Sequence, residues 1–177
     1  MSTPVRLRPL EPADWPLVLE LNAAEVPRVA PMDQDRAEWI RALADRFDVI
    51  EVDGEFAGSV VTLRPGTAYD SKNYRWFSER YGTQFDYLDR IVIDDRFRRR
   101  GLASAVYDAV EESALPRERL VLEVNIDPPN QPSLEFHRLR GYREVTQLGE
   151  PGHRVSLMTR DIAERPGTSP TKGRAKT

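Results

Sequence analysis

The sequence of 177 residues contains no cysteine and only two histidines, His137 and His153. The lack of cysteine excludes disulfides, thiolate nucleophiles and cysteine-ligated zinc. Two imidazoles are too few for a histidine-rich metal centre, so we expect no bound metal. A chain without disulfides fits a reducing compartment, and we expect the protein to be cytoplasmic.

Long apolar runs and an excess of positive charge are also lacking. No apolar stretch approaches the ~20 residues that a membrane-spanning helix needs. Residues 1–8 enter a strand pattern without the apolar core of a signal peptide. The 26 Lys and Arg residues are outnumbered by 29 Asp and Glu residues, which gives a net charge of −3. A general nucleic-acid binder would usually carry the opposite sign, so we expect neither a membrane nor a nucleic acid as a partner.

The chain does contain a regular succession of strand and helix patterns, and 40% of its residues are hydrophobic. This length and composition predict one α/β domain with a sizeable core. β-rich runs predict seven strands, at residues 5–10, 48–52, 56–63, 85–93, 120–126, 142–147 and 153–160. Helical spacing predicts four helices, at residues 14–22, 33–47, 101–116 and 130–141.

Two further segments stand apart from these patterns. Residues 64–83 form a connection of ~20 residues rich in aromatic side chains, and a connection this long predicts a functional loop, a concealed short helix, or both. From residue 164 onward Pro, Gly, Ser, Thr and Lys dominate, without a large apolar side chain to anchor the chain. We therefore expect a folded domain at residues 1–162 and a disordered tail at residues 163–177.

The most informative segment, residues 91–104, reads as an apolar strand, a basic turn, a glycine and a helix. A helix start offers unpaired N–H groups and a partial positive charge, which suit phosphate oxygens. Gly101 allows a close backbone approach, Ala103 keeps the first turn free of bulk, and the arginines at 98–100 add charge. The spacing does not match a Walker loop or a Rossmann loop. The segment predicts a phosphate site, and a solvated basic turn before an ordinary helix fits it equally well.

The pattern Arg98-x-x-Gly101-x-Ala103 resembles the pyrophosphate loop of the GNAT acetyltransferase superfamily, which reads Gln/Arg-x-x-Gly-x-Gly/Ala. The resemblance covers residues 4–160, and is strongest to a poorly characterised bacterial branch of predicted acetyltransferases. It implies a single GNAT-like domain with a central twisted sheet that is mixed but mostly antiparallel. About seven strands and about four helices would make up this acyl-CoA N-acyltransferase domain at residues 1–162.

The resemblance also implies where the acyl donor, acetyl-CoA, binds as a co-substrate. In the family, the strand before the loop and the next strand diverge, and pantetheine lies between them. The residues that carry this expectation are Ile91, Val92 and Ile93 along pantetheine, Arg98, Arg99, Arg100, Gly101, Leu102, Ala103 and Ser104 at the pyrophosphate, and Asn130 where the family often has a coenzyme-contacting asparagine.

Acyl transfer to an amine requires a base, a donor to the carbonyl oxygen and an acid for the leaving thiolate. Glu123 is the candidate base, because Leu122 and Val124 make its strand apolar and desolvation raises the pKa of a carboxyl. Glu123 also matches the base position of some bacterial relatives. A carboxylate that faces water or pairs with an arginine is the alternative. Tyr87 aligns with the base position of other relatives, and its phenol is no substitute for a carboxylate.

Many relatives carry tyrosine as the acid four residues before a Gly-aromatic pair, where this chain has His137. An imidazole with a pKa near ~6.5 is mostly neutral at pH 7, so proton donation competes with a packing or helix-capping role. A tyrosine of residues 69–81 and unassisted departure of the thiolate are the alternatives. We expect the donor to the carbonyl oxygen to be a backbone N–H of residues 91–93.

Acceptor sites in the family lie between the first two helices, near the aromatic connection and at the last hairpin. The residues that we assign to this role are Glu25, Arg28, Tyr74, Arg75 and Trp76. An arginine could hold the carboxylate of an amino acid, and the aromatic side chains could wall a small amine. We expect an N-acetyltransferase that acts on a primary amine of a small molecule or amino acid, with a protein or peptide acceptor as the alternative.

Two other classes of protein fit parts of the sequence. A non-catalytic acyl-CoA-binding sensor or partner module is suggested by His137 in place of the family tyrosine. A nucleic-acid binder is suggested by the arginine run and the basic residues at 172–176, but the net charge opposes it. The edge strand near the last hairpin could pair between subunits, which makes a homodimer possible.

Overall fold

The structure is a computed structural model and describes residues 4–162; the tail expected at residues 163–177 lies outside the described residues. The strands are β1 (Val5–Pro9), β2 (Arg46–Val52), β3 (Glu55–Leu63), β4 (Asp86–Ile93), β5 (Arg119–Asp127), β6 (Arg143–Glu150) and β7 (His153–Asp161). The α-helices are α1 (Trp15–Glu25), α2 (Gln34–Leu43), α3 (Lys72–Tyr81), α4 (Leu102–Ala114) and α5 (Gln131–Leu139). Three short 3-10 helices are η1 (Pro12–Asp14), η2 (Asp95–Phe97) and η3 (Leu115–Arg117).

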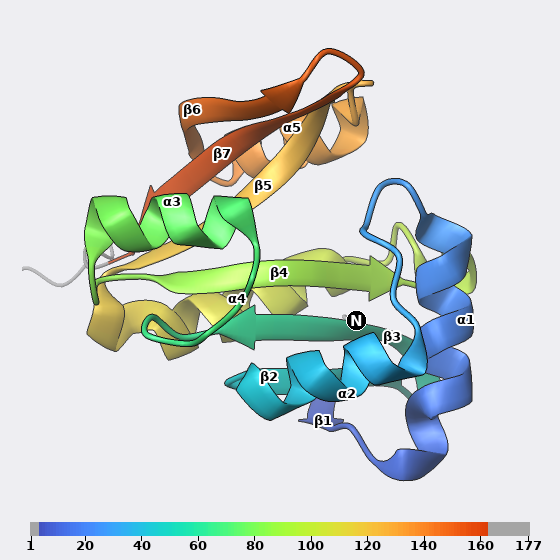
Figure 1. Ribbon diagram of the computed structural model, residues 1–177. Coiled ribbons are helices and arrows are strands. Elements are labelled where there is room, and N and C mark those ends of the chain that lie inside the picture. The colour runs from blue at the N-terminus through green and yellow to red at the C-terminus, as the bar shows by residue number, and fades with distance from the viewer. Residues whose placement is uncertain (1–3, 163–177) are drawn as a thin grey trace, which may run out of the picture.

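The seven strands form one sheet in the order β1-β2-β3-β4-β5-β7-β6 (Figure 1). All neighbouring strands are antiparallel except β4 and β5, which run parallel. This confirms the mixed, mostly antiparallel sheet that the resemblance implied. Residues 4–162 contain five α-helices rather than about four, because the aromatic connection contains α3. The Ser71 side chain caps α3 by accepting a hydrogen bond from the backbone N–H of Tyr74.

The second predicted helix ends earlier than its spacing indicated. Asp33 caps α2 with its side chain, and the helix ends at Leu43. Phe47, which continued the helical spacing, lies in β2 opposite Val61 and is buried. Spacing alone does not distinguish a last helical turn from the first inward-facing residue of a strand. Pairing with β3 places Phe47 in the strand. Its ring packs edge-on against Trp15, with ring centroids 5.7 Å apart.

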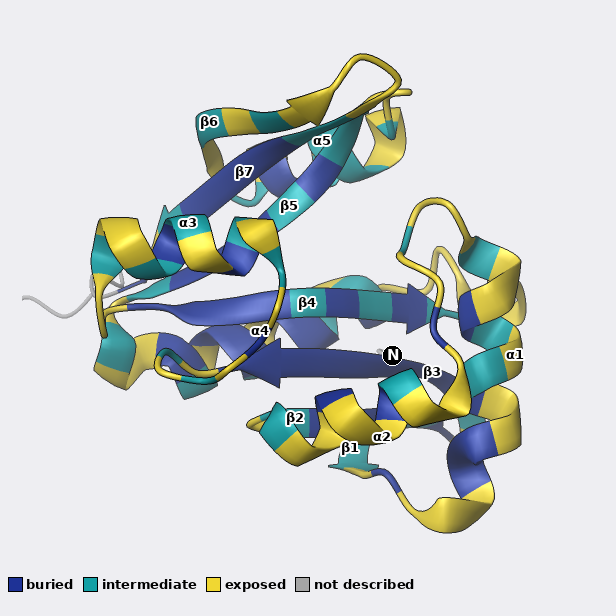
Figure 2. Cartoon of the chain, viewed as in Figure 1, coloured by how far each residue is buried: buried dark blue, intermediate teal, exposed yellow. Residues whose placement is uncertain are grey.

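The sheet separates two hydrophobic cores. Helices α1, α2 and α3 pack on one face, and α4 and α5 pack on the other. The strands are mostly buried, whereas the outer surfaces of the helices are exposed (Figure 2). Along β5, Val121 belongs to the core under α1–α3, while Leu120 and Leu122 belong to the core under α4 and α5. Because strand side chains alternate, Glu123 lies on the same face as Val121.

Strand β4 pairs with β5 only at its beginning. Asp86 lies opposite Leu120 and Tyr87 lies opposite Val121, and no further residues of the two strands pair. Beyond this point the strands diverge (Figure 1). The facing backbone groups of both strands are therefore left without the ladder that a regular sheet would provide.

The other edge of β4 carries a β-bulge. Thr62 of β3 pairs with Leu88, whereas the preceding Val61 pairs with Arg90. Asp89 is therefore an extra residue on β4 without a partner of its own. A bulge resets the alternation of side chains along a strand, and this one lies beside the point of divergence.

Candidate active site

A cavity of about 1030 Å³ opens where β4 and β5 diverge. The end of β4 and the start of α4 form one wall, β5 and the start of α5 form another, and the connection between α1 and α2 forms a third. Ten of the eleven residues expected to bind acetyl-CoA line this cavity, namely Ile91, Val92, Ile93, Arg98, Arg99, Gly101, Leu102, Ala103, Ser104 and Asn130. The eleventh, Arg100, does not line it and lies over the Phe97 ring, with its guanidinium carbon 5.5 Å from the centroid.

The turn before α4 has a backbone geometry that suits an anion. Arg99 and Gly101 have positive φ values of 60° and 77°. Gly101 is the N-cap residue of α4, and no side chain caps this helix. The first N–H groups of α4 are therefore available to phosphate oxygens. A Cβ on residue 101 would meet no atom within 4 Å, so glycine is favoured here by backbone conformation, and the space before the helix is open.

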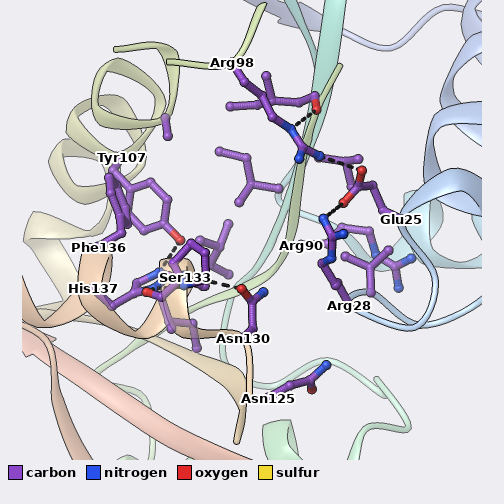
Figure 3. Close-up of a pocket in the computed structure, with 18 of the residues that line it drawn as sticks. Glu25, Arg28, Arg90, Arg98, Tyr107, Asn125, Asn130, Ser133, Phe136 and His137 are labelled. Carbon is purple, nitrogen blue, oxygen red and sulfur yellow. Dashed lines mark hydrogen bonds and ion pairs between the residues drawn. The ribbon is translucent and has the colours of Figure 1, made fainter. Parts of the chain in front are cut away.

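Arg98 links this turn to the end of α1. Its guanidinium pairs with the carboxylate of Glu25 at 2.5 Å and with that of Asp95 at 2.8 Å. The second oxygen of Glu25 pairs with Arg28 at 3.2 Å, so one carboxylate joins two arginines along one side of the cavity (Figure 3). Glu25 and Arg28, which we predicted to contact the acceptor, thus line the same cavity as the predicted donor-binding residues.

The other three residues predicted to contact the acceptor do not line the cavity. Tyr74 is buried in the core under α3, and its hydroxyl donates to the backbone carbonyl of Arg64 at 2.6 Å. Trp76 packs edge-on against Phe77, with ring centroids 5.5 Å apart. Arg75 lies on the exposed face of α3. The aromatic residues of α3 fill the core because the apolar face of this helix covers the sheet, which spacing in the sequence did not reveal.

Glu123 lines the cavity near the point where β4 and β5 part. The hydroxyl of Tyr87 donates to its carboxylate, at 2.7 Å from one oxygen and 2.8 Å from the other. Burial, and then the negative charge of Asp89, raise the pKa of Glu123 to about 7. The hydrogen bond from Tyr87 and the nearby amide of Asn73 lower the pKa and oppose this rise. Among residues 4–162 no lysine or arginine forms an ion pair with Glu123, so the carboxylate is set up to exchange a proton near neutral pH.

Residues that sequence reasoning missed line the same end of the cavity. Asp89 and Arg90 come from β4, and Asn125 comes from β5 two residues after Glu123. The amide of Asn125 donates to the backbone carbonyl of Pro27 at 3.3 Å, which joins β5 to the connection between α1 and α2. The even spacing of residues 123 and 125 on one strand was a signal that could have identified Asn125. The β4 residues had no such signal, because the bulge changes their direction.

His137 is buried on α5 and lines the cavity beside Tyr107 (Figure 3). Its Nδ1 lies 2.6 Å from the backbone carbonyl oxygen of Ser133, so Nδ1 carries a hydrogen and donates it. Its Nε2 lies 2.6 Å from the hydroxyl oxygen of Tyr107 and accepts the hydrogen of that hydroxyl. Burial lowers the pKa of His137, which favours the neutral ring. In this state neither nitrogen holds a proton that could pass into the cavity.

Tyr107 lines the cavity, although no pattern in the sequence indicated that it belongs to the site. It lies on α4 next to Val106, and the sequence around it is typical of the inner face of a core helix. Its contact with the cavity depends on a partner 30 residues later in the chain, His137. No local pattern reports such a pairing.

No three His, Asp or Glu side chains are grouped to hold a metal ion within residues 4–162. In the same part of the chain, no helix is long and apolar enough to cross a membrane.

Comparison with known proteins identifies a family that the sequence matches. A family model described as "Acetyltransferase (GNAT) family" matches residues 8–142. Among curated proteins, no sequence matches the chain.

Several solved structures have the same fold. Ard1 from Thermoplasma volcanium superposes with a TM-score of 0.71 at 20% identity, covering 90% of this chain and 99% of its own. The ribosomal-protein-S18-alanine N-acetyltransferase from Escherichia coli has a TM-score of 0.60 at 16% identity, covering 91% and 96%. Arabidopsis thaliana Naa50, in complex with the bisubstrate analogue CoA-Ac-MVNAL, has a TM-score of 0.65 at 11% identity, covering 89% and 98%. At these identities the likeness concerns the fold.

Proposed function

The chain belongs to the GNAT acetyltransferase family, and on that premise we propose that it acetylates a primary amine of a small molecule. Acetyl-CoA is the acyl donor and Glu123 is the general base. The observation that carries the proposal is the position of Glu123: a partly buried carboxylate with a pKa of about 7 lines the cavity where β4 and β5 part. A base of this pKa is matched to proton transfer at neutral pH.

The cavity suits acetyl-CoA by the chemistry of its walls. Beyond Tyr87, the backbone of β4 has no ladder with β5, and its free amide groups can pair with the amides of pantetheine. The uncapped start of α4, with Arg98 and Arg99 beside it, suits the pyrophosphate. These features support a donor that lies along the gap with its thioester toward Glu123.

The reaction requires an amine that has lost its proton. Glu123 with a pKa of about 7 is ionised in about half of the molecules at pH 7, and it accepts the proton directly or through one water. The amine nitrogen then bonds to the carbonyl carbon and loses its second proton to solvent, the carbon–sulfur bond breaks, and the thiolate departs. Tyr87 holds the Glu123 carboxylate in one orientation by donating to both of its oxygens.

We assign His137 and Tyr107 to the wall that holds the donor, and not to protonation of the thiolate. In the neutral tautomer, His137 donates from Nδ1 and accepts at Nε2, so it has no proton to deliver. The Tyr107 hydroxyl directs its hydrogen to His137, and burial raises its pKa, which makes it a weak acid. The departing thiolate therefore takes its proton from solvent.

A small acceptor is supported by the hydrogen bond between Asn125 and Pro27. This bond joins β5 to the connection between α1 and α2 across the acceptor side of the cavity. An extended chain that entered by this side would have to break it. Arg28, whose side chain is 58% exposed, offers a cation at the same wall for the carboxylate of an amino acid.

A peptide amino terminus is the second candidate acceptor. Two proteins of the same fold are named for, or bound to, such acceptors: the S18-alanine N-acetyltransferase and the Naa50 complex. The same cavity and the same base would serve this reaction if the connection between α1 and α2 moved away from Asn125.

The test is thiol release from acetyl-CoA against small amines, amino acids, their decarboxylated counterparts and short peptides. We expect release with a class of small amines and a loss of about 10²-fold or more in Glu123→Gln, the usual size of general-base catalysis. Glu112→Gln, which removes an exposed carboxylate of α4 outside the cavity, is the matched control and should keep full activity. Release that survives in Glu123→Gln would overturn the base. Release with peptides alone would favour the second candidate.

A further inference from the structure

Strand β4 carries a buried ion pair that the proposed mechanism does not use. The Nε of Arg90 lies 2.6 Å from a carboxylate oxygen of Asp89, and the two side chains are only 4% and 5% exposed. Both residues line the cavity, as Glu123 does. Adjacent residues of a regular strand point to opposite faces, but these two share one face because the bulge inserts Asp89. A local irregularity has therefore placed a charged pair in the wall of the site.

Arg90 also reaches the acceptor side of the cavity. Its Nη1 donates to the side-chain oxygen of Asn22 in α1 at 2.8 Å and to the backbone carbonyl of Ala30 at 3.2 Å. The amide of Asn22 donates to the same carbonyl at 3.1 Å. These three bonds tie the connection between α1 and α2 to β4, and residues 27–29 of that connection line the cavity.

The charges of this pair act on Glu123 in opposite directions. The charge of Asp89 raises the pKa of Glu123, and the charge of Arg90 lowers it. Tyr69 donates to Asp89 and remains neutral, because burial and then the Asp89 charge raise its own pKa. The titratable, charged or polar groups that share this environment with Glu123 are Tyr87, Asp89 and Arg90 from β4, Tyr69 from the segment before α3, Asn73 from α3, and Glu25 and Arg28 from the α1 side of the cavity.

We propose that Asp89 and Arg90 are a positioning pair, which balances the charge beside Glu123 and anchors the acceptor wall to β4. The effects of this pair on kinetics rest on the proposed function, because they assume that Glu123 is the base. Its effect on the ionisation of Glu123 does not. Without Asp89 an unbalanced cation would face Glu123, and without Arg90 an unbalanced anion would face it. The two losses should therefore shift the ionisation of Glu123 in opposite directions. An ion pair too far from Glu123 to act on its charge would leave this ionisation in place.

The first experiment measures the pH dependence of kcat/KM. In Asp89→Asn, which keeps the shape of the side chain, we expect the acidic limb of the profile to move to lower pH. In Arg90→Met it should move to higher pH, and Arg90→Lys should return it toward the wild-type position because the charge is restored. Asp86→Asn is the matched control. Asp86 is a buried carboxylate of the same strand that pairs with Arg117 and does not line the cavity, so its loss should leave the limb in place.

A neutral substitution separates the anchoring role from the electrostatic one. Asn22→Ala removes two of the three bonds that hold the Ala30 carbonyl and Arg90, but it changes no charge. We expect the KM for the acceptor to rise while the acidic limb stays where it is. An unchanged KM in this variant would overturn the anchoring role.

Side-chain ¹³C NMR then reads the ionisation of Glu123 without reference to catalysis, with Glu123→Gln used to assign the resonance. Opposite displacements of the titration in Asp89→Asn and Arg90→Met support the pair, even if the kinetic limb proves to belong to another group. A kinetic limb that belongs to another group would overturn only the assignment of Glu123 as the base. A titration that stays in place in both variants, while Glu123→Gln abolishes turnover, would overturn the positioning pair and leave the proposed function standing.

Discussion

Replacing the proposed base should make the folded protein more stable at neutral and alkaline pH. In the folded protein the pKa of Glu123 is about 7, against 4.5 for an ordinary glutamate, chiefly because of burial. The folded state therefore binds this proton more tightly than the unfolded chain does. The resulting stability is fully present below pH 4.5 and is lost as the pH rises from 4.5 through about 7. A difference of about 2.5 between the two pKa values corresponds to a cost of about 3 kcal/mol for the ionised carboxylate.

Glu123→Gln removes the charge, preserves the shape and leaves an oxygen that can accept the hydrogen bond from Tyr87. We expect the free energy of unfolding of the variant to exceed that of the wild type by about 2 to 3 kcal/mol at pH 8. The difference should shrink to about 0.4 kcal/mol at pH 4.5, where the carboxyl is neutral in the folded protein and half ionised in the unfolded chain. For a chain of this size the gain at pH 8 amounts to about 5 to 10 °C in Tm.

Urea unfolding followed by circular dichroism at pH 4.5, 6, 7 and 8 would measure this difference, with Glu112→Gln as the exposed control. A stability gap that does not change with pH, or a wild type more stable than Glu123→Gln at pH 8, would refute the reasoning. Either result would mean that Glu123 ionises with an ordinary pKa in the folded protein. A gain in stability together with a loss of turnover is the trade-off expected when a charged group is buried for chemistry.

Gly101→Glu should weaken acetyl-CoA binding at least about tenfold by calorimetry, because it adds a carboxylate to the proposed phosphate site and strains a residue at φ 77°; unchanged affinity would argue against this turn as the site. Gly58→Ala should destabilise the fold by about 1 to 3 kcal/mol in urea unfolding, since its Cβ would lie 2.1 Å from the Val92 carbonyl oxygen. Asp86→Asn should cost about 3 kcal/mol, because Arg117 would lose a bidentate, largely buried partner. A loss below 1 kcal/mol would show that water replaces this partner.

Features that depend on neighbouring residues could be read from the sequence. The seven strands, the turn at Gly101 and the helix concealed in the aromatic connection all appear near their predicted places. Glu123 became the candidate base because its neighbours in the strand are apolar, and this local property predicted desolvation of its carboxylate. The error at Phe47 has the same origin, since its spacing fitted a helix while its actual partner, Val61, lies across a ladder.

Features that depend on distant residues could not be read in this way. Tyr107 and His137 meet because α4 and α5 cover the same face of the sheet, and Tyr74 is buried because α3 covers the opposite face. Asp89 and Arg90 share a face only because β4 and β3 pair out of step at the bulge. Each of these contacts is a consequence of packing between elements that are far apart in the chain.

The sequence by itself determined the elements, the family resemblance, the turn at Gly101 and the candidacy of Glu123, because backbone conformation and side-chain alternation are set by short stretches of chain. Only the tertiary structure decided which side chains meet in the cavity, which hydrogen bonds His137 makes, and that a buried ion pair shares the cavity with Glu123. The physical reason is that burial and charge act through space. The pKa of Glu123 is raised by the walls that surround it and by the charge of Asp89 on a neighbouring strand, and neither can be located before the sheet is assembled.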